Sequence, residues 1–264
     1  MLAAYLDFLA SSVGGITGHQ LLVAIHLALA PLTLLILVFI SAPYGRFVRD
    51  GWGPQVPGRL GWIIMETPAV VGFVVVWLST GGWARTASLL FGGLWLVHYI
   101  HRTFIFPFRL ASTRPMPLVV ALLAFAYQCL NAPTQAWQLG ALGDYSTAWL
   151  TDPRCLSGLA IMVGGLVVNV QSDTILMNLR KPGETGYKIP ARGLYRYVTA
   201  ANYFGELLIW VGFAVGTWSL SGLAFAAYTF ANLAPRAAES HRWYREKFGA
   251  DYPSERKRLI PFIW

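Results

Sequence analysis

Hydrophobic residues in this chain form long continuous runs, and short polar segments separate one run from the next. A helix needs about 20 mostly apolar residues to cross a lipid bilayer. On that criterion we predict seven membrane-spanning helices. Pro133 interrupts the fourth, so the C-terminal boundary of that helix is the least defined. The predicted spans are residues 19–41, 60–79, 84–106, 115–137, 155–178, 200–217 and 219–235.

The composition also indicates a membrane protein. Of the 264 residues, 56% are hydrophobic and only 12% are charged, which excludes an ordinary soluble domain. We therefore predict an all-α, polytopic membrane protein that forms one membrane domain over residues 1–264 and acts as a monomer. Trp218 and its neighbours alone separate the sixth and seventh spans, so these two spans should form a tight helical hairpin.

The basic residues predict how the helices are oriented. Eighteen of the 20 Lys and Arg residues lie around the loops after the first, third and fifth spans or in the C-terminal tail. Because cytoplasmic loops carry the excess of Lys and Arg, the N-terminus should be outside and the C-terminus in the cytosol. Arg85 and Arg154 alone lie on the opposite side. The net charge of +8 is thus explained by membrane topology and by contacts with anionic lipid rather than by nucleic-acid binding. We expect the protein in a bacterial inner membrane or in an endoplasmic reticulum membrane.

A polar stretch at the end of the fifth predicted span is the centre of the candidate site. Asn169, Asp173 and Arg180 lie within about 40° of one another on a helix with roughly 100° per residue, so they share one face. Polar side chains inside an apolar span are unfavourable unless other polar groups face them. We predict that this face lines a cofactor pocket open to the cytosol, and that the polar loop over residues 180–199 folds across its mouth.

Three acidic residues fall inside predicted spans, namely Glu66, Asp173 and Glu206. An ionisable residue within the bilayer indicates a functional site. Asn202 and Glu206 are four residues apart on the sixth helix and face the same way, so we expect them to meet Asn169 and Asp173 across the bundle. The alternative is a structural polar pair that holds the two helices together.

Glu66 and Tyr99 are candidate hydrogen-bond donors. A carboxyl group that stays protonated in a low-dielectric site becomes a donor, and Pro68 could open room for a ligand beside Glu66. A phenol together with such a carboxyl can hold one carbonyl oxygen and stabilise negative charge on it. His98 and His101 lack a third ligand at metal-binding spacing, and the two cysteines form no metal motif, so we predict no metal site.

The C-terminal segment is basic and aromatic. Arg236, Trp243 and Lys247 share one helical face after the seventh span, as helical spacing requires. Tyr244 lies beside that face, and Arg256 follows in the tail. One interpretation is an amphipathic helix on the membrane surface. The other is a lid whose arginines bind phosphate.

Together these segments resemble one known family, the steroid 5α-reductases. The resemblance covers nearly all of the chain and is densest from Asn169 to Trp264. That family is similar to the enoyl and polyprenol reductases, and its C-terminal half is similar to the isoprenylcysteine methyltransferases. The segments that carry the resemblance are Glu66–Pro68, His98–Arg102, Asn169–Asp173, Arg180–Glu184, Ala201–Glu206, His241–Tyr244 and Tyr252–Phe262.

The resemblance implies an NADPH-dependent reductase of a steroid or similar lipid enone. The substrate would bind mainly among the first four spans, residues 1–137, and the cofactor mainly in residues 155–264. The implied cofactor-binding residues are Asn169, Asp173, Arg180, Asn202, Glu206, Arg236, Tyr244 and Arg256, together with Arg102 and His241.

Two positions depart from the family pattern. Met65 stands where some members have Gln beside the carboxylate, which bears on substrate fit. Ser240 stands where a second His is common, which leaves His241 alone and bears on the cofactor contact there.

The implied reaction converts a 3-oxo-Δ4-steroid into a 5α-reduced 3-oxosteroid. Glu66 and Tyr99 would polarise the C3 carbonyl so that the β-carbon accepts hydride from NADPH, after which the adjacent carbon takes a proton. No G-x-G-x-x-G motif follows a strand, so a Rossmann cofactor site is not expected. Arginine suits the 2′-phosphate of NADPH.

Other classes of protein remain open. A reductase of another lipid, of the enoyl or polyprenol type, or a lipid-directed S-adenosylmethionine methyltransferase would use the same C-terminal half, although methyl transfer does not require Glu66 and Tyr99. A receptor or sterol-binding protein leaves the buried carboxylates unexplained. The first lysine, Lys181, lies outside every span, which excludes a buried retinal Schiff base.

Overall fold

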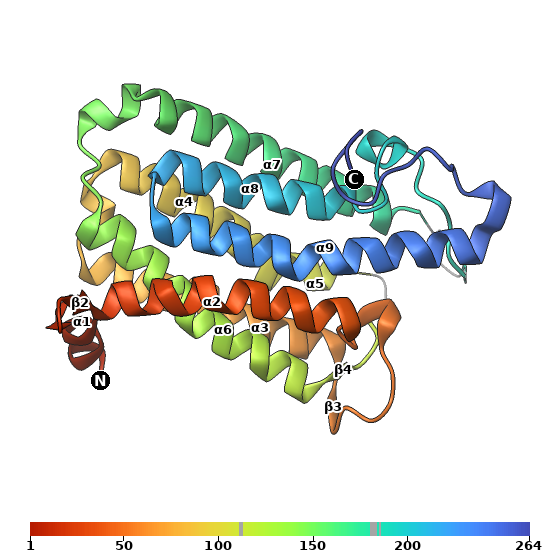
Figure 1. Ribbon diagram of the computed structural model, residues 1–264, viewed down its shortest axis with the longest axis horizontal. Coiled ribbons are helices and arrows are strands. Elements are labelled where there is room, and N and C mark those ends of the chain that lie inside the picture. The colour runs from red at the N-terminus through yellow and green to blue at the C-terminus, as the bar shows by residue number, and fades with distance from the viewer. Residues whose placement is uncertain (111–112, 180–183, 185) are drawn as a thin grey trace.

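The structure, a computed structural model, describes residues 1–110, 113–179, 184 and 186–264. Long helices run side by side along an elongated bundle (Figure 1). Among the described residues, five helices are long and apolar enough to cross a membrane, so the chain is a multi-pass membrane protein. They are α2 (Gly18–Phe39), α3 (Gly58–Ser79), the continuous helix Thr86–Arg109, the continuous helix Leu118–Leu142, and α7 (Pro153–Met177).

The sixth and seventh predicted spans are also helical. α8 (Ala201–Thr217) and α9 (Leu220–Phe248) form the expected tight hairpin, with Trp218 in the left-handed conformation at φ 46°. Ser219 caps α9, because its hydroxyl oxygen accepts a hydrogen bond from the Gly222 N–H at 3.1 Å. Whether α8 and α9 cross the whole bilayer stays a prediction.

α9 joins the seventh predicted span and the predicted basic helix into one helix of 29 residues. Pro235 lies inside it and does not end it. An internal proline removes one backbone donor, but packing against neighbouring helices makes it tolerable in membrane proteins. The small, buried Ala234 and Ala237 flank the proline and pack against Leu259 of the tail.

Two of the long helices contain a π-helical turn. α4 (Thr86–Ile100) passes into α5 (Phe106–Arg109) through His101–Ile105, and α6 (Leu118–Trp137) ends in a π-helical turn at Gln138–Leu142. Such turns are frequent at functional sites. The hydrophobic pattern does not reveal them, and the first of the two carries Arg102.

Short elements complete the chain. α1 (Leu2–Ala10) precedes an antiparallel ribbon of β1 (Ser12–Val13) and β2 (Ile16–Thr17). A second antiparallel ribbon pairs β3 (Gln55–Val56) with β4 (Met116–Pro117), and it ties together the segments that lead into α3 and α6. The all-α prediction missed both ribbons. Short 3₁₀ turns cover Gly45–Phe47, Gly82–Ala84, Thr147–Thr151, Gly193–Arg196 and Gly249–Asp251.

Aromatic rings fill the core of the bundle. Trp95 of α4 is fully buried, and its ring centroid lies 4.9 Å from that of Phe73 and 5.0 Å from that of Trp210. Its indole N–H donates to the Ala69 carbonyl at 2.8 Å. Large buried rings contribute strongly to packing, and these fix α3, α4 and α8 around the site.

Glycine residues let α7 and α8 approach closely. The two helices lie side by side and have the most extensive contact in the fold (Figure 1). A Cβ atom at Gly165 would lie 2.5 Å from the Ile209 nitrogen, and one at Gly205 would lie 2.5 Å from the Asn169 nitrogen. Small residues permit such an approach between membrane helices. The glycines therefore bring Asn169 of α7 within reach of α8.

We expect Gly165→Ala to lower the unfolding temperature of the protein in detergent. The added methyl group forces α7 and α8 apart, and overpacking of this kind destabilises by about 1–3 kcal/mol. The neighbouring Gly164 is exposed and would place a Cβ with no atom within 4 Å. Gly164→Ala is thus the matched control, and it should leave the unfolding temperature unchanged or raise it, since alanine favours helix. Equal unfolding temperatures for both variants would contradict this account of the interface.

Candidate functional site

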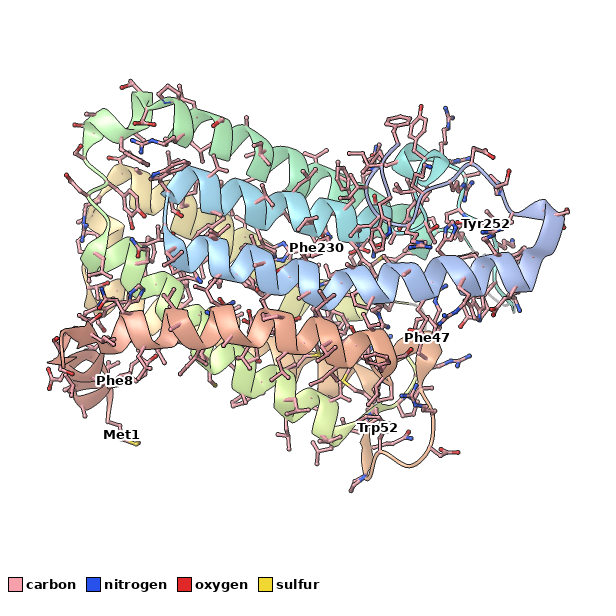
Figure 2. All side chains as sticks on the ribbon, viewed as in Figure 1. Met1, Phe8, Phe47, Trp52, Phe230 and Tyr252 are labelled. Atoms are coloured by element: carbon pink, nitrogen blue, oxygen red, sulfur yellow. The ribbon has the colours of Figure 1, made fainter. Side chains whose placement is uncertain are left out.

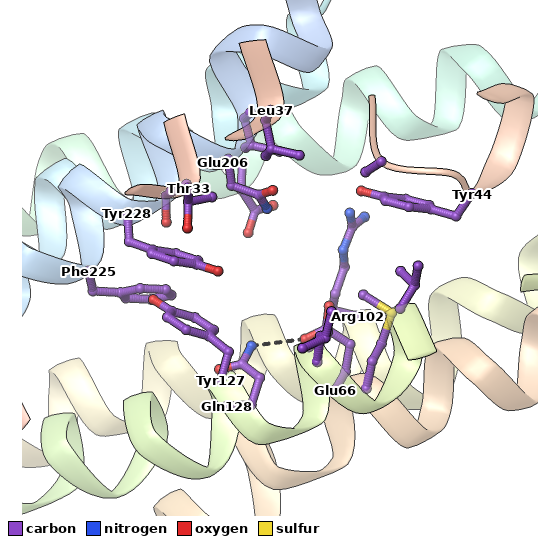
Figure 3. A pocket seen from close by; sticks show the side chains of 18 of the residues that line it. Thr33, Leu37, Tyr44, Glu66, Arg102, Tyr127, Gln128, Glu206, Phe225 and Tyr228 are labelled. Atoms are coloured by element: carbon purple, nitrogen blue, oxygen red, sulfur yellow. Dashed lines mark hydrogen bonds between the residues drawn. The ribbon is translucent and has the colours of Figure 1, made fainter. Parts of the chain in front are cut away.

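A cavity of about 300 Å³ lies between α2, α3, α4, α6, α8 and α9. Its volume is at the small end of the range for small-molecule pockets, about 300–1,000 Å³. Most of the wall is apolar or aromatic, and Figure 3 shows the side chains of 18 of the lining residues. The charged and amide side chains in the wall are Glu66, Arg102, Gln128, Glu206 and Asn232.

Gln128 of α6 brings Glu66 and Tyr99 together. Its side-chain NH₂ group donates to Glu66 Oε2 at 3.1 Å, the bond drawn in Figure 3, and to the Tyr99 hydroxyl oxygen at 3.2 Å. The three side chains come from α3, α4 and α6, so no local spacing in the sequence relates them. The two predicted donors therefore lie beside one another on the cavity wall.

Packing holds Tyr99 in this position. Its side chain is 3% exposed, and its ring stacks on Trp210 with 5.5 Å between centroids and 27° between planes. The ring centroid of Trp95 lies 4.8 Å from that of Tyr99. Because these rings leave Tyr99 little rotational freedom, its hydroxyl stays at the cavity.

A second polar network joins α7 to α8. The Asn169 amide donates to the Asn202 backbone carbonyl at 3.0 Å and to Glu206 Oε2 at 3.1 Å. The Asn202 amide in turn donates to Asp173 Oδ1 at 2.9 Å. The two polar faces expected from helical spacing thus meet across the bundle, and each supplies the partners that buried polar groups need.

Arg102 connects this network to the cavity. Its guanidinium pairs with Asp173 at 3.1 Å and also lines the cavity. The same group lies over the rings of Trp62 and Phe106, 4.8 and 4.5 Å from their centroids. The Trp62 indole donates to the Arg102 carbonyl at 2.9 Å. The hydrogen bond from Trp62 therefore fixes the position of the π-helical turn beside the cavity.

His98 holds Glu206, a role that the sequence analysis missed. Its Nε2 lies 3.0 Å from Glu206 Oε1, and its side chain is buried. The Trp210 indole donates to the same oxygen at 3.1 Å. The available signal was the four-residue spacing of His98 and Arg102, which places both on one side of a regular helix.

The segment between α2 and α3 closes against α9 through Arg236. The Arg236 guanidinium donates to the Tyr203 hydroxyl at 2.9 Å and to the Tyr44 carbonyl at 3.1 Å. It also lies 3.7 Å from the Tyr44 ring centroid and 5.3 Å from that of Phe47, which Figure 2 shows beside α9. Arg236, expected at the cofactor, thus binds protein groups here, and Tyr44 is a cavity residue that no sequence signal indicated.

The C-terminal tail packs on α9 through aromatic rings, near Tyr252 in Figure 2. Tyr244 is buried and stacks on Tyr252 with 5.5 Å between centroids. The Thr199 hydroxyl lies 2.6 Å from His241 Nδ1 and 2.7 Å from the Tyr252 hydroxyl. Burial, with two nearby arginines, lowers the pKa of His241. Its imidazole is therefore neutral near pH 7 and can accept a hydrogen bond from Thr199.

Two arginines in this region carry N–H groups that no described residue accepts. Arg256 is 6% exposed, and its Nε and Nη1 have no partner among the described residues. The guanidinium carbon of Arg46 lies 4.9 Å from the Trp243 ring centroid and 5.0 Å from that of Tyr244. The buried Nη1 of Arg46 also lacks an acceptor among the described residues. Buried donors require acceptors, and phosphate oxygens suit the guanidinium fork. These two side chains can bind an anionic group.

The structure distributes the predicted site residues over three places. Those that line the cavity are Glu66, Tyr99, Arg102 and Glu206. Those in the network between α7 and α8 are Asn169, Asp173 and Asn202. Those in the second half of α9 and in the tail are Arg236, His241, Tyr244 and Arg256. Arg180 lies outside the described residues.

Comparison with known proteins identifies the family. The family model for 3-oxo-5-alpha-steroid 4-dehydrogenase matches residues 114–264. The 3-oxo-5-alpha-steroid 4-dehydrogenase 1 of Bos taurus is 42% identical over 240 residues, which cover 89% of this chain and 93% of that protein. The protein of the same name from Rattus norvegicus is 44% identical over 227 residues, or 85% and 87% of the two chains. The steroid 5-alpha-reductase DET2 of Gossypium hirsutum is 42% identical over 251 residues, or 93% and 97%. The resemblance seen in the sequence is thereby confirmed, and the chain belongs to the 3-oxo-5-alpha-steroid 4-dehydrogenase family.

Proposed function

We propose that this chain reduces the Δ4 double bond of 3-oxo-Δ4-steroids and produces 5α-reduced 3-oxosteroids. The observation that supports the proposal most directly is the pair of Glu66 and Tyr99 on the wall of a mostly apolar cavity. A flat apolar ligand with one carbonyl oxygen matches apolar walls with a few convergent polar groups. The names of the relatives agree with this substrate class.

In this proposal, the role of Glu66 and Tyr99 is to polarise the substrate carbonyl. The Tyr99 hydroxyl and a protonated Glu66 can each donate to the C3 oxygen and stabilise the negative charge that develops there. Electron withdrawal through the conjugated alkene makes the β-carbon electrophilic. When bound, NADPH supplies the hydride that the β-carbon accepts. A proton added at the adjacent carbon then completes the saturated ketone.

We assign NADPH as the cofactor. The N–H groups of Arg256 and Arg46 that lack an acceptor among the described residues fit phosphate groups. Arginine also favours the 2′-phosphate that distinguishes NADPH from NADH. Arg102 and Glu206 line the cavity, and we propose that the cofactor contacts both of them there. The further residues proposed to hold the cofactor are Asn169, Asp173, Arg180, Asn202, Arg236, His241 and Tyr244.

We also propose seven spans in a monomer, with the N-terminus outside and the C-terminus in the cytosol. Figure 1 shows the N-terminus and the C-terminal tail towards opposite ends of the bundle. At the second of these ends, Arg46 of the segment after α2 lies over the Trp243 ring of α9, and Arg236 of α9 donates to the Tyr44 carbonyl. Residues 1–137 would bind mainly substrate and residues 155–264 mainly cofactor, although α8 and α9 also contribute to the cavity.

The direct test is a substrate screen of the purified protein with NADPH, with products identified by mass. A Δ4-3-ketosteroid should gain two hydrogen atoms as NADPH is oxidised. An enoyl thioester and a polyprenyl enone test the related reductases, and S-adenosylmethionine with an isoprenylated thiol tests methyl transfer. An unchanged steroid alongside turnover of any other pair would overturn the proposal.

We expect Glu66→Gln and Tyr99→Phe each to lower kcat for the enone by roughly 100-fold or more, as the loss of an oxyanion-stabilising donor does. NADPH affinity, measured by fluorescence titration, should stay close to that of the unmodified protein. Tyr145→Phe is the matched control, because it removes a buried phenol that donates to the Thr217 carbonyl outside the cavity. Near-normal turnover in both site variants would refute the assigned roles.

Arg256→Gln should weaken NADPH binding by roughly 10- to 100-fold, the range expected for hydrogen bonds to a charged group. At saturating NADPH, kcat should recover, because Arg256 is not among the cavity residues. Lys257→Gln at the exposed neighbouring position is the control for loss of one positive charge. Equal NADPH affinity in the two variants would remove Arg256 from the cofactor site.

A further inference from the structure

Three amide side chains form a ladder along the inner face of α6. Gln128, Asn131 and Gln135 follow the helical spacing i, i+3, i+7, and they are 8%, 0% and 0% exposed. The Asn131 NH₂ group donates to Gln128 Oε1 at 3.1 Å, and the Gln135 NH₂ group donates to Asn131 Oδ1 at 3.3 Å. Only Gln128 reaches the cavity wall.

A backbone carbonyl sets the direction of the ladder. The Gln135 NH₂ group also donates to the Ser221 carbonyl of α9 at 2.9 Å. A side-chain amide can exchange its oxygen and nitrogen by rotation, and its orientation follows from its partners. A backbone carbonyl accepts only, so Gln135 must present its NH₂ group to Ser221. Asn131 must then turn its oxygen towards Gln135 and its NH₂ group towards Gln128.

This direction decides which group Gln128 presents to the donor pair. With its oxygen occupied by Asn131, Gln128 directs its NH₂ group at Glu66 Oε2 and at the Tyr99 hydroxyl oxygen. The Tyr99 oxygen accepts from the amide, which leaves its own hydrogen free for the cavity. A proton on Glu66 is favoured on Oε1, because the unprotonated oxygen of a carboxyl group is the better acceptor and Oε2 accepts from Gln128. A Gln128 side chain turned the other way would instead take the Tyr99 hydrogen for itself.

We propose that the ladder from Ser221 through Gln135 and Asn131 to Gln128 is a positioning device that aims both donor hydrogens of Glu66 and Tyr99 at the substrate carbonyl. This inference rests on the proposed function, since it concerns the two donors of that reaction. It assigns no contact with substrate to Asn131 or Gln135. It makes those two buried residues positioning residues of the reaction, at positions outside the cavity wall.

The test uses Asn131→Leu and Gln135→Met, which break the ladder at sites that do not line the cavity. Asn131→Leu keeps the branched shape of the side chain at a larger volume, Gln135→Met keeps roughly the volume, and both remove the amide. Asn131→Ala serves as a smaller change at the first site. Thr134→Val is the matched control, because Thr134 is equally buried on α6 and, among the described residues, its hydroxyl bonds only to the Leu130 carbonyl of its own helix.

We expect kcat for the Δ4-3-ketosteroid to fall about tenfold in each ladder variant, as misplacement of reacting groups does, with KM nearly unchanged. The double variant should lose no more than either single variant, because residues of one hydrogen-bonded network are not additive. Thr134→Val should keep the kcat of the unmodified protein.

A readout of carbonyl polarisation separates aiming from mere stability. The infrared C=O stretch of a bound, ¹³C3-labelled ketosteroid with NADP⁺ should lie at lower frequency in the unmodified protein and in Thr134→Val. In the ladder variants it should shift back towards its value in an apolar solvent. An unshifted stretch, with or without a lower unfolding temperature, would show a structural role and overturn the inference. If the unmodified protein reduces no enone, the proposed function itself fails, and that result is seen before any variant is compared.

Discussion

Polar side chains inside an apolar helical bundle must find hydrogen-bond partners within the protein, and the rest of this structure depends on that constraint. An unpaired amide or carboxyl group at bilayer depth has no water to bind. Asn169, Asp173, Asn202 and Glu206 satisfy one another across α7 and α8 only because glycines let the two backbones approach. The same packing that removes the penalty of burial therefore assembles the site.

The two polar networks are coupled through the long helix Thr86–Arg109. Tyr99 belongs to the network of the cavity, whereas His98 and Arg102 bind Glu206 and Asp173 of the other. A hydride acceptor and its donor must lie within contact of each other, so a reductase requires its substrate and cofactor groups in a fixed relation. One rigid helix that carries residues of both networks provides it, with the π-helical turn placing Arg102 beside the cavity.

The contacts between the segment after α2 and the second half of α9 involve aromatic rings and backbone carbonyls more than carboxylates. The chain has 20 basic but only 12 acidic residues, so at least eight Lys and Arg side chains have no Asp or Glu of their own. Arg46 and Arg236 lie instead over aromatic rings. A cation–π contact of this kind leaves the N–H groups of the guanidinium available as hydrogen-bond donors. Arg256 and Arg46 keep unsatisfied donors among the described residues, as a region that receives an anionic ligand would.

The sequence by itself determined the helical membrane class, the approximate helix ranges and the facing of Asn169 and Asp173 towards Asn202 and Glu206. Each follows from local periodicity, because hydrophobicity and helical spacing are properties of neighbouring residues. Only the tertiary structure decided that Gln128 bridges Glu66 and Tyr99, that Arg236 grips the segment after α2, and that His98 holds Glu206. Those contacts depend on the relative rotation and register of helices far apart in the chain, which no single run of residues encodes.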